Sequence, residues 1–215
     1  MLALISQKII EDQNRELDAL DHNYTKYLEK FKLELIPVSN IRNNQDFYHS
    51  LPIERIILSG GEDIGESKQR DETERRLLDF AINRKIPVLG ICRGMQFINF
   101  YFGGGLIKSI KNEIGTNINH VAANHLVEIT NNKLAEILGN EIYVNSYHNQ
   151  GINSVNLASG LKDFAQTKEG VIEGIYHPNL PIAGIQWHPE RENQYNEAND
   201  KILNSFLNQT LFWKK

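Results

Sequence analysis

The chain has 215 residues, 40% of them hydrophobic, so it can bury a full core and is expected to form a single α/β domain over residues 1–215. Its formal net charge is -4 at pH 7 and its basic residues are dispersed, which excludes an electrostatic footprint for nucleic acid. The apolar runs are too short for a signal peptide or a membrane span, so we expect no membrane partner and a cytoplasmic location.

Strand-like and helix-like segments alternate through the first half of the chain. Strands are predicted at 2–6, 33–38 and 55–59, and helices at about 15–31 and 71–84, where apolar residues recur three or four positions apart. This alternation predicts a mostly parallel central sheet with helices on both faces.

The only cysteine, Cys92, lies between a short apolar run and a helix-like segment. Residues 86–91 predict a buried strand and residues 93–102 a helix, so the turn between them must be tight, and glycines 90 and 94 remove side chains that would clash there. A thiol at a helix N-terminus is favoured as the thiolate. Most free cysteines are small buried hydrophobes, but this setting favours a nucleophile. A single cysteine also excludes an intrachain disulfide and a Cys-based zinc site.

The second half is richer in strands and ends in a helix. Strands are predicted at 125–130, 141–147, 163–168, 171–176 and 182–187, and the closing helix at about 196–212. Glu169-Gly170 suits a hairpin turn between two of these strands. There is no internal repeat and no linker-like segment, which agrees with one domain.

A histidine and a glutamate follow the last predicted strand as Trp187-His188-Pro189-Glu190. A cysteine nucleophile needs a base, and the base needs an orienting partner. His188 and Glu190 are two residues apart, so their side chains point to the same side of an extended segment. One histidine alone is more often a surface residue, and it is the combination with Cys92 that indicates catalysis.

The paired glycines Gly60-Gly61 follow the third predicted strand, and loops after parallel strands meet at one edge of the sheet. The backbone N–H groups of Gly61 and Arg93 are therefore candidates for a two-donor oxyanion hole. The alternative is that Gly60-Gly61 is only a turn.

Five segments together resemble one known family. LSGGEDIG, PVLGICRGMQFIN, GGGL, VNSYHNQGI and GIQWHPE, in this order and spacing, resemble the class I glutamine amidotransferase superfamily, with the γ-glutamyl hydrolase type of cysteine peptidase (C26-type) as the nearest branch. The resemblance runs from about residue 24 to 190. It implies a flavodoxin-like sandwich with a mostly parallel central sheet, helices on both faces and a small antiparallel accessory sheet.

The resemblance also implies roles for single residues. Cys92 would be the nucleophile, His188 the base and Glu190 its orienter, with Gly61 and Arg93 supplying the oxyanion amides and no metal or cofactor required. The implied substrate contacts are Gly60, Gln96, Asn124, His125, Ser146, His148 and Gln150. For Gln96 the alternative is a helix residue capping a loop, and for His125, Ser146, His148 and Gln150 it is hydrogen bonding at strand ends.

Some segments depart from the family pattern. The stretch after the paired glycines, EDIGESKQRDETE, is short and lacks the branch's usual continuation, and an Asp-Gly turn of the branch is Glu169-Gly170 here. These loops flank the pocket mouth, which indicates an unusual leaving group. Arg93, Lys108 and Lys111 are candidates for meeting a phosphate there, with a solvated charge as the alternative for each lysine.

The expected activity is hydrolysis of a γ-glutamyl amide through a γ-glutamyl thioester, which releases L-glutamate. Candidate substrates are γ-glutamyl-CDP-amidate of capsule phosphoramidate biosynthesis, γ-glutamyl-putrescine and γ-glutamyl-GABA. A free-standing hydrolase is favoured because the chain has no room for a synthetase domain. The alternatives are a glutaminase subunit that delivers ammonia to a synthase partner, and a regulatory module that has lost turnover.

Overall fold

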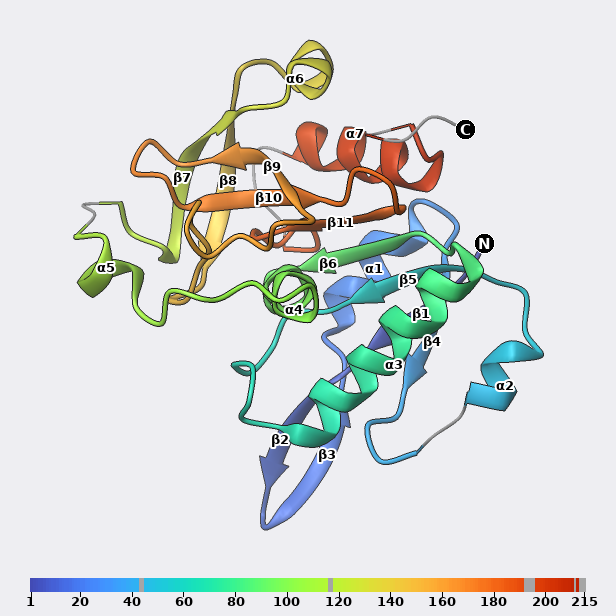
Figure 1. The fold of residues 1–215 in the computed structure, drawn as a ribbon. Helices are drawn as coiled ribbons and strands as arrows, with labels where there is room; N and C mark the ends of the chain where they lie inside the picture. Colours follow the sequence, from blue (N-terminus) through green and yellow to red (C-terminus); the bar gives the residue numbers. More distant parts are fainter. Residues whose placement is uncertain (43–44, 116–117, 192–195, 211, 213–215) are drawn as a thin grey trace.

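The computed structural model describes residues 1–42, 45–115, 118–191, 196–210 and 212. Strands from both halves of the chain form one nine-stranded sheet in the order β4-β1-β5-β6-β11-β10-β9-β7-β8 (Figure 1). The strands from β4 to β11 pair in parallel, and those from β11 to β8 pair antiparallel. The sheet is therefore mixed, and a separate two-stranded antiparallel sheet, β2-β3, accompanies it.

The strands are β1 (Leu2–Ser6), β2 (Lys8–Asp12), β3 (Arg15–Ala19), β4 (Glu34–Val38), β5 (Ile53–Leu58), β6 (Val88–Ile91), β7 (Val121–Ile129), β8 (Glu141–Tyr147), β9 (Lys162–Gln166), β10 (Ile172–Tyr176) and β11 (Ile182–Ile185). The helices are α1 (His22–Glu29), α2 (Gln45–His49), α3 (Lys68–Arg84), α4 (Arg93–Tyr101), α5 (Ile110–Glu113), α6 (Asn132–Leu138) and α7 (Asn196–Leu207). The predicted α/β architecture is confirmed.

Helices cover both faces of the sheet, because successive strand residues point to opposite sides. Ala3 and Ile5 of β1 pack into a core with α1, α6 and α7. Leu4, between them, packs into a second core with α3 and α4. These two layers hold the central strands rigidly, which fixes the loops at their ends.

The helix expected over 15–31 is wrong in its first part. Residues 15–19 form β3, which pairs with β2 as a hairpin, and the helix spans only His22–Glu29. Gln13 and Asn14 both have positive φ, 50° and 62°, as a two-residue hairpin turn requires. Leu17 was expected to lie on the buried face of a helix, but its side chain is 38% exposed. Its distance in sequence from the next apolar residues therefore did not reflect burial.

Other predicted boundaries move by a few residues. The helix expected from 71 begins at Lys68, where the Ser67 side chain accepts a hydrogen bond from Arg70 N–H. The closing helix ends at Leu207 instead of 212. The Glu169-Gly170 turn does lie between β9 and β10, and Gly170 has φ 81°.

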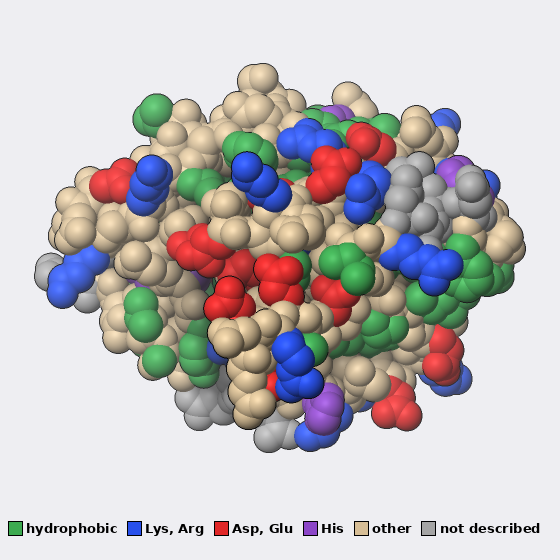
Figure 2. Space-filling model, turned by 90° about the horizontal axis from the view of Figure 1, so that it is seen from below, with side chains coloured by type: hydrophobic (Ala, Val, Ile, Leu, Met, Phe, Trp, Pro, Cys, Tyr) green, Lys and Arg blue, Asp and Glu red, His purple; other side chains and the backbone are tan. Residues whose placement is uncertain are grey.

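Strands β5, β6 and β11 are neighbours and parallel, so their carboxyl ends meet at one edge of the sheet. Gly60-Gly61, Cys92 and His188 follow these three strands. No helix among the described residues is long and apolar enough to cross a bilayer. On the face shown in Figure 2, acidic side chains gather near the centre and basic ones are interspersed with other types, so this face carries no continuous basic surface.

Candidate active site

Cys92 lies at a sharp turn between β6 and α4, with φ 53° and ψ -106°. A non-glycine residue with such a backbone costs on the order of 1–3 kcal/mol and persists only where its surroundings enforce it. Close packing enforces it here: a Cβ on Gly94 would lie 2.1 Å from the Leu58 carbonyl oxygen, and one on Gly90 would lie 2.5 Å from the Gly94 carbonyl carbon. The expected tight strand–turn–helix geometry is thus present.

His188 stands between Cys92 and Glu190. Its Nδ1 lies 2.6 Å from Glu190 Oε1. On its other side the imidazole lies beside Cys92, since a Cβ on Gly60 would meet both His188 Cε1 and Cys92 Cβ, and the two side chains shift each other's pKa. Asn145 of β8 holds the histidine backbone, because its side chain donates to the His188 carbonyl and accepts from the His188 N–H, both at 2.8 Å. Sulfur, imidazole and carboxylate are therefore in contact in that order.

Asn145 was not among the residues predicted for the site. It lies within the VNSYHNQGI segment, next to Ser146, but no local pattern distinguishes an asparagine that clamps a distant backbone from one that ends a strand. Only the pairing of β8 with the rest of the sheet reveals its role.

The electrostatic environment of Cys92 and His188 favours transfer of the thiol proton to the imidazole. Burial alone raises the pKa of the Cys92 thiol, but the charge and hydrogen bond of His188 outweigh it and hold that pKa below its usual value. Burial lowers the pKa of His188, yet the Cys92 sulfur and the Glu190 carboxylate raise it to about 9. Both shifts act in the same direction and favour a thiolate–imidazolium pair over a neutral thiol and imidazole.

A cavity of about 360 Å³ opens over these side chains. Its lining residues are Lys8, Ile9, Ile10, Ala19, Leu20, Asp21, Tyr24, Ser59, Gly60, Gly61, Glu62, Cys92, Tyr147, His188, Glu190 and Arg191. One wall comes from the β2-β3 hairpin, whose second strand lies where the start of a helix had been predicted. The floor carries the cysteine, and the size suits a small molecule.

The Gly60-Gly61 loop is fitted closely to its surroundings. Gly60 N–H donates to the Tyr24 hydroxyl at 2.8 Å. A Cβ on Gly60 would lie 2.7 Å from His188 Cε1, and one on Gly61 would lie 2.0 Å from Arg70 Nη1. Both glycines are thus required sterically, beyond making a turn.

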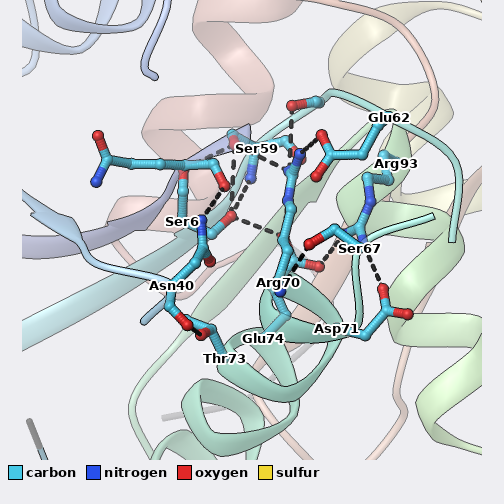
Figure 3. Close-up of polar contacts among 12 residues, drawn as sticks. Ser6, Asn40, Ser59, Glu62, Ser67, Arg70, Asp71, Thr73, Glu74 and Arg93 are labelled. Atoms are coloured by element: carbon cyan, nitrogen blue, oxygen red, sulfur yellow. Dashed lines mark hydrogen bonds and ion pairs between the residues drawn. The ribbon is translucent and has the colours of Figure 1, made fainter. Parts of the chain in front are cut away.

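A buried ionic network on α3 holds this loop and the cysteine turn together (Figure 3). Arg70 donates to the carbonyl oxygens of Ser59 and Gly60, at 2.8 and 3.1 Å, and pairs with Glu74 at 3.1 Å. Glu74 also pairs with Arg93, the residue after the cysteine. One carboxylate therefore couples the two segments that carry the predicted oxyanion amides.

The Arg93 side chain is not available to a phosphate at the pocket mouth, contrary to expectation. It is 2% exposed and is held by Asp71 and Glu74. Its guanidinium belongs to the ionic network of α3.

Two glutamines lie under the cysteine. Gln96, one helical turn beyond it, donates to the Gln150 carbonyl at 3.2 Å and to the Gln186 side chain at 3.3 Å. Gln186 in turn approaches Cys92 Sγ at 3.5 Å. The predicted substrate role of Gln96 stays a prediction, because the structure gives its amide these internal partners and does not place it on the cavity wall.

Of the other predicted substrate residues, Gly60 lines the cavity, whereas Asn124, His125, Ser146, His148 and Gln150 are not among its lining residues. Asn124 is exposed on β7, and the Ser146 hydroxyl donates to the His120 carbonyl at 2.8 Å. The Gln150 side chain donates to Asp63 at 2.6 Å. His125 and His148 are buried and face Glu173, at 3.7 and 3.4 Å.

The chain matches the peptidase C26 family model over residues 5–190. It is 34% identical over 166 residues to the gamma-glutamyl-CDP-amidate hydrolase of Campylobacter jejuni, covering 74% of this chain and 72% of that protein. It is 29% identical over 196 residues to anthranilate synthase component 2 of Cyanophora paradoxa, covering 89% and 94%.

A solved structure shares the fold. The glutaminase domain of the Trypanosoma brucei CTPS, solved with bound acivicin, superposes with a TM-score of 0.67 over 100% of this chain and 97% of that domain, at 15% identity. The fold expected from the sequence is confirmed by this likeness. The chain belongs to the peptidase C26 family, and so to the hydrolases that share the class I glutamine amidotransferase fold.

Proposed function

We propose that the protein hydrolyses a γ-glutamyl amide and releases L-glutamate, with Cys92 as nucleophile, His188 as acid and base and Glu190 as the group that orients it. The observation that carries the proposal is the buried contact chain from the Cys92 thiol through His188 to Glu190 at the floor of a cavity. Membership in the C26 family supports the same chemistry.

In the proposed reaction, the Cys92 thiolate attacks the γ-carbonyl carbon, and the backbone amides of Gly61 and Arg93 stabilise the oxyanion. One such donor contributes about 3–4 kcal/mol to transition-state stabilisation. His188 protonates the departing nitrogen, which leaves a γ-glutamyl thioester on the sulfur. The neutral imidazole then removes a proton from water, and attack of this water on the thioester frees glutamate and restores the thiolate–imidazolium pair.

For the leaving group, we propose γ-glutamyl-CDP-amidate as the first candidate. The relative from Campylobacter jejuni supports it, as does the presence of Lys8 and Arg191 among the cavity-lining residues, because cationic side chains suit a diphosphate. Lys8 comes from the β2-β3 hairpin, whereas Arg191 follows Glu190 and lies over the Tyr147 ring at 4.0 Å. γ-Glutamyl-putrescine and γ-glutamyl-GABA are the competing substrates.

A glutaminase subunit that passes ammonia to a synthase partner is the second candidate. Its support is the likeness to a synthase component over 94% of that component's length. Such a subunit hydrolyses glutamine slowly alone and is strongly stimulated by the synthase that co-purifies with it.

The deciding experiment measures glutamate release by the purified protein from glutamine, γ-glutamyl-CDP-amidate, γ-glutamyl-putrescine and γ-glutamyl-GABA. We expect turnover of at least one of the last three, and a loss on the order of 10⁴-fold or more in Cys92→Ala. Wild-type protein that releases no glutamate from any of the four, alone or with a co-purifying synthase, contradicts the proposal. Full activity of Cys92→Ala would show that Cys92 is not the nucleophile.

A further inference from the structure

Four buried side chains that the proposed reaction does not use meet beside the active-site cavity. They are His120, His125, His148 and Glu173, and each is at most 6% exposed. His120 directly precedes β7, His125 lies in the middle of β7, His148 follows β8, and Glu173 lies on β10. Their metal-binding atoms all lie within 4.8 Å of one another. Residues so far apart in the sequence converge here.

Hydrogen bonds fix the orientation of two of the rings. His148 Nδ1 lies 2.8 Å from the Gln150 carbonyl, and His125 Nδ1 lies 3.3 Å from the Leu126 carbonyl. Since a carbonyl only accepts, both Nδ1 atoms carry the proton in the neutral ring, and each Nε2 offers a lone pair to the cluster. Metal-binding histidines are held in this way by a backbone carbonyl on the far nitrogen.

The facing atoms have no hydrogen-bond partner in the described part of the chain. This holds for Nε2 of His125 and His148, for both ring nitrogens of His120 and for both carboxylate oxygens of Glu173. Buried polar atoms are almost always partnered, and lone pairs that face a carboxylate repel it. A cation between them removes both costs.

The distances match those in a tetrahedral metal site. Zn²⁺ binds His nitrogen and carboxylate oxygen at about 2.0–2.2 Å, so two ligand atoms of a tetrahedron are about 3.3–3.6 Å apart. Glu173 Oε1 lies 3.5 Å from His120 Nδ1, 3.7 Å from His125 Nε2 and 3.4 Å from His148 Nε2. Three of the tetrahedral edges are thus already near their bound lengths.

We propose that His120, His125, His148 and Glu173 bind one divalent transition-metal ion, with Zn²⁺ as the ion that fits three imidazoles and one carboxylate best. Four protein ligands complete a tetrahedron, so the site is structural and leaves no position for substrate. His120 and His148 also line a second cavity of about 310 Å³, which gives the ion a route from solvent. The site was not expected from the single cysteine, because its ligands are all nitrogen and oxygen.

The ion would brace the floor under the nucleophile. Glu173 accepts through its backbone carbonyl from Gln186 N–H at 2.8 Å, and the Gln186 side chain approaches Cys92 Sγ. The Gln150 carbonyl that accepts from His148 also accepts from Gln96. The cluster therefore fixes both glutamines beneath the sulfur through short connections.

The test uses metal-free protein prepared with a chelator, given Zn²⁺ and dialysed, with bound zinc counted by elemental analysis. Every protein in this comparison also carries Cys92→Ala, so that the thiol cannot bind the ion. We expect one zinc per chain in this background and in His22→Ala, an exposed histidine that serves as the matched control. His125→Ala and Glu173→Gln should each weaken zinc binding about 100-fold or more.

Co²⁺ provides a readout that does not depend on the variants. Tetrahedral Co²⁺ absorbs strongly in the visible range, and we expect this spectrum when it is added to the metal-free protein, together with a higher midpoint of thermal unfolding. Less than a tenth of an equivalent of zinc and no such spectrum overturn the proposal, and a proton then bridges the cluster instead. Equal zinc affinity in His125→Ala and the control overturns it as well. None of these outcomes depends on γ-glutamyl hydrolysis.

Discussion

At the scale of single residues, the proposed reaction depends on one thiol and the imidazole that faces it. His188 has its pKa raised to about 9, and the same contact lowers the pKa of Cys92. The reactive pair therefore exists above the lowered thiol pKa and is lost as the pH rises through about 9, where His188 gives up the proton that the leaving group needs. We expect glutamate release to fall over that upper range.

Replacement of His188 by glutamine should move the thiol titration upward. Without the imidazole, burial is the main remaining influence, and burial raises the pKa of a thiol. The rate of alkylation by iodoacetamide against pH, followed by mass spectrometry, checks this at a single site because the chain has one cysteine. His22→Gln is the control. An unchanged alkylation midpoint in His188→Gln contradicts the assigned contact.

Gly94 makes the turn at Cys92 possible by allowing α4 to approach β5. A Cβ at this position would lie 2.1 Å from the Leu58 carbonyl oxygen, so Gly94→Ala must push the helix away from the strand. We expect a loss of about 1–3 kcal/mol in unfolding free energy and a larger relative loss of activity. In Gly160→Ala, the control, the nearest atom to the new Cβ is 4.0 Å away. Equal thermal midpoints for the two variants would falsify this account of the turn.

At the scale of elements, α3 acts as the brace between two active-site loops. Glu74 is fully buried and pairs with both Arg70 and Arg93. Its removal leaves two buried guanidinium groups without the one fully buried carboxylate that they share, so that among the described carboxylates Arg70 keeps only Glu62 and Arg93 only Asp71. We therefore expect Glu74→Ala to lower the unfolding free energy by about 3–5 kcal/mol. Urea denaturation measures this loss.

Glu72, on the exposed side of the same helix, provides the control for Glu74. Its pair with Arg76 is 3.5 Å long and its side chain is 55% exposed, so Glu72→Ala should cost less than about 1 kcal/mol. A similar loss in both variants contradicts the role of the buried network.

The elements also show where prediction from sequence works. The strand–cysteine–helix unit was predictable because glycines 90 and 94 permit only a tight turn, and the resemblance of its sequence to a known family is specific. The β2-β3 hairpin was missed because Leu17 and Leu20 imitate helical spacing, while the positive φ at Gln13 and Asn14 leaves no strong sequence signal without glycine. That hairpin supplies part of the cavity wall, so the leaving-group side of the site was the harder part to predict.

At the scale of the whole molecule, the parallel half of the sheet followed from the alternation of strands and helices, and it brought Gly61, Cys92 and His188 to one edge as expected. The histidine–glutamate cluster did not follow, because its members come from β7 and the residue before it, from β10 and from a loop after β8. Only strand pairing across the antiparallel half brings them together. Contacts between distant strands leave no regular spacing in the sequence from which they could be predicted.

The position of β11 in the sheet sets the order in which the protein can mature on the ribosome. This strand, near the end of the chain, fills the space between β6 and β10, so the earlier strand β6 keeps an unpaired edge until residues 182–185 have been synthesised. The segment that brings His188 to the sulfur arrives at the same moment. Until then, a nascent chain has a Cys92 thiol without its histidine and an unpaired strand edge that is prone to aggregation. Insertion of β11 into the sheet pairs the edge and brings His188 to the thiol at the same time.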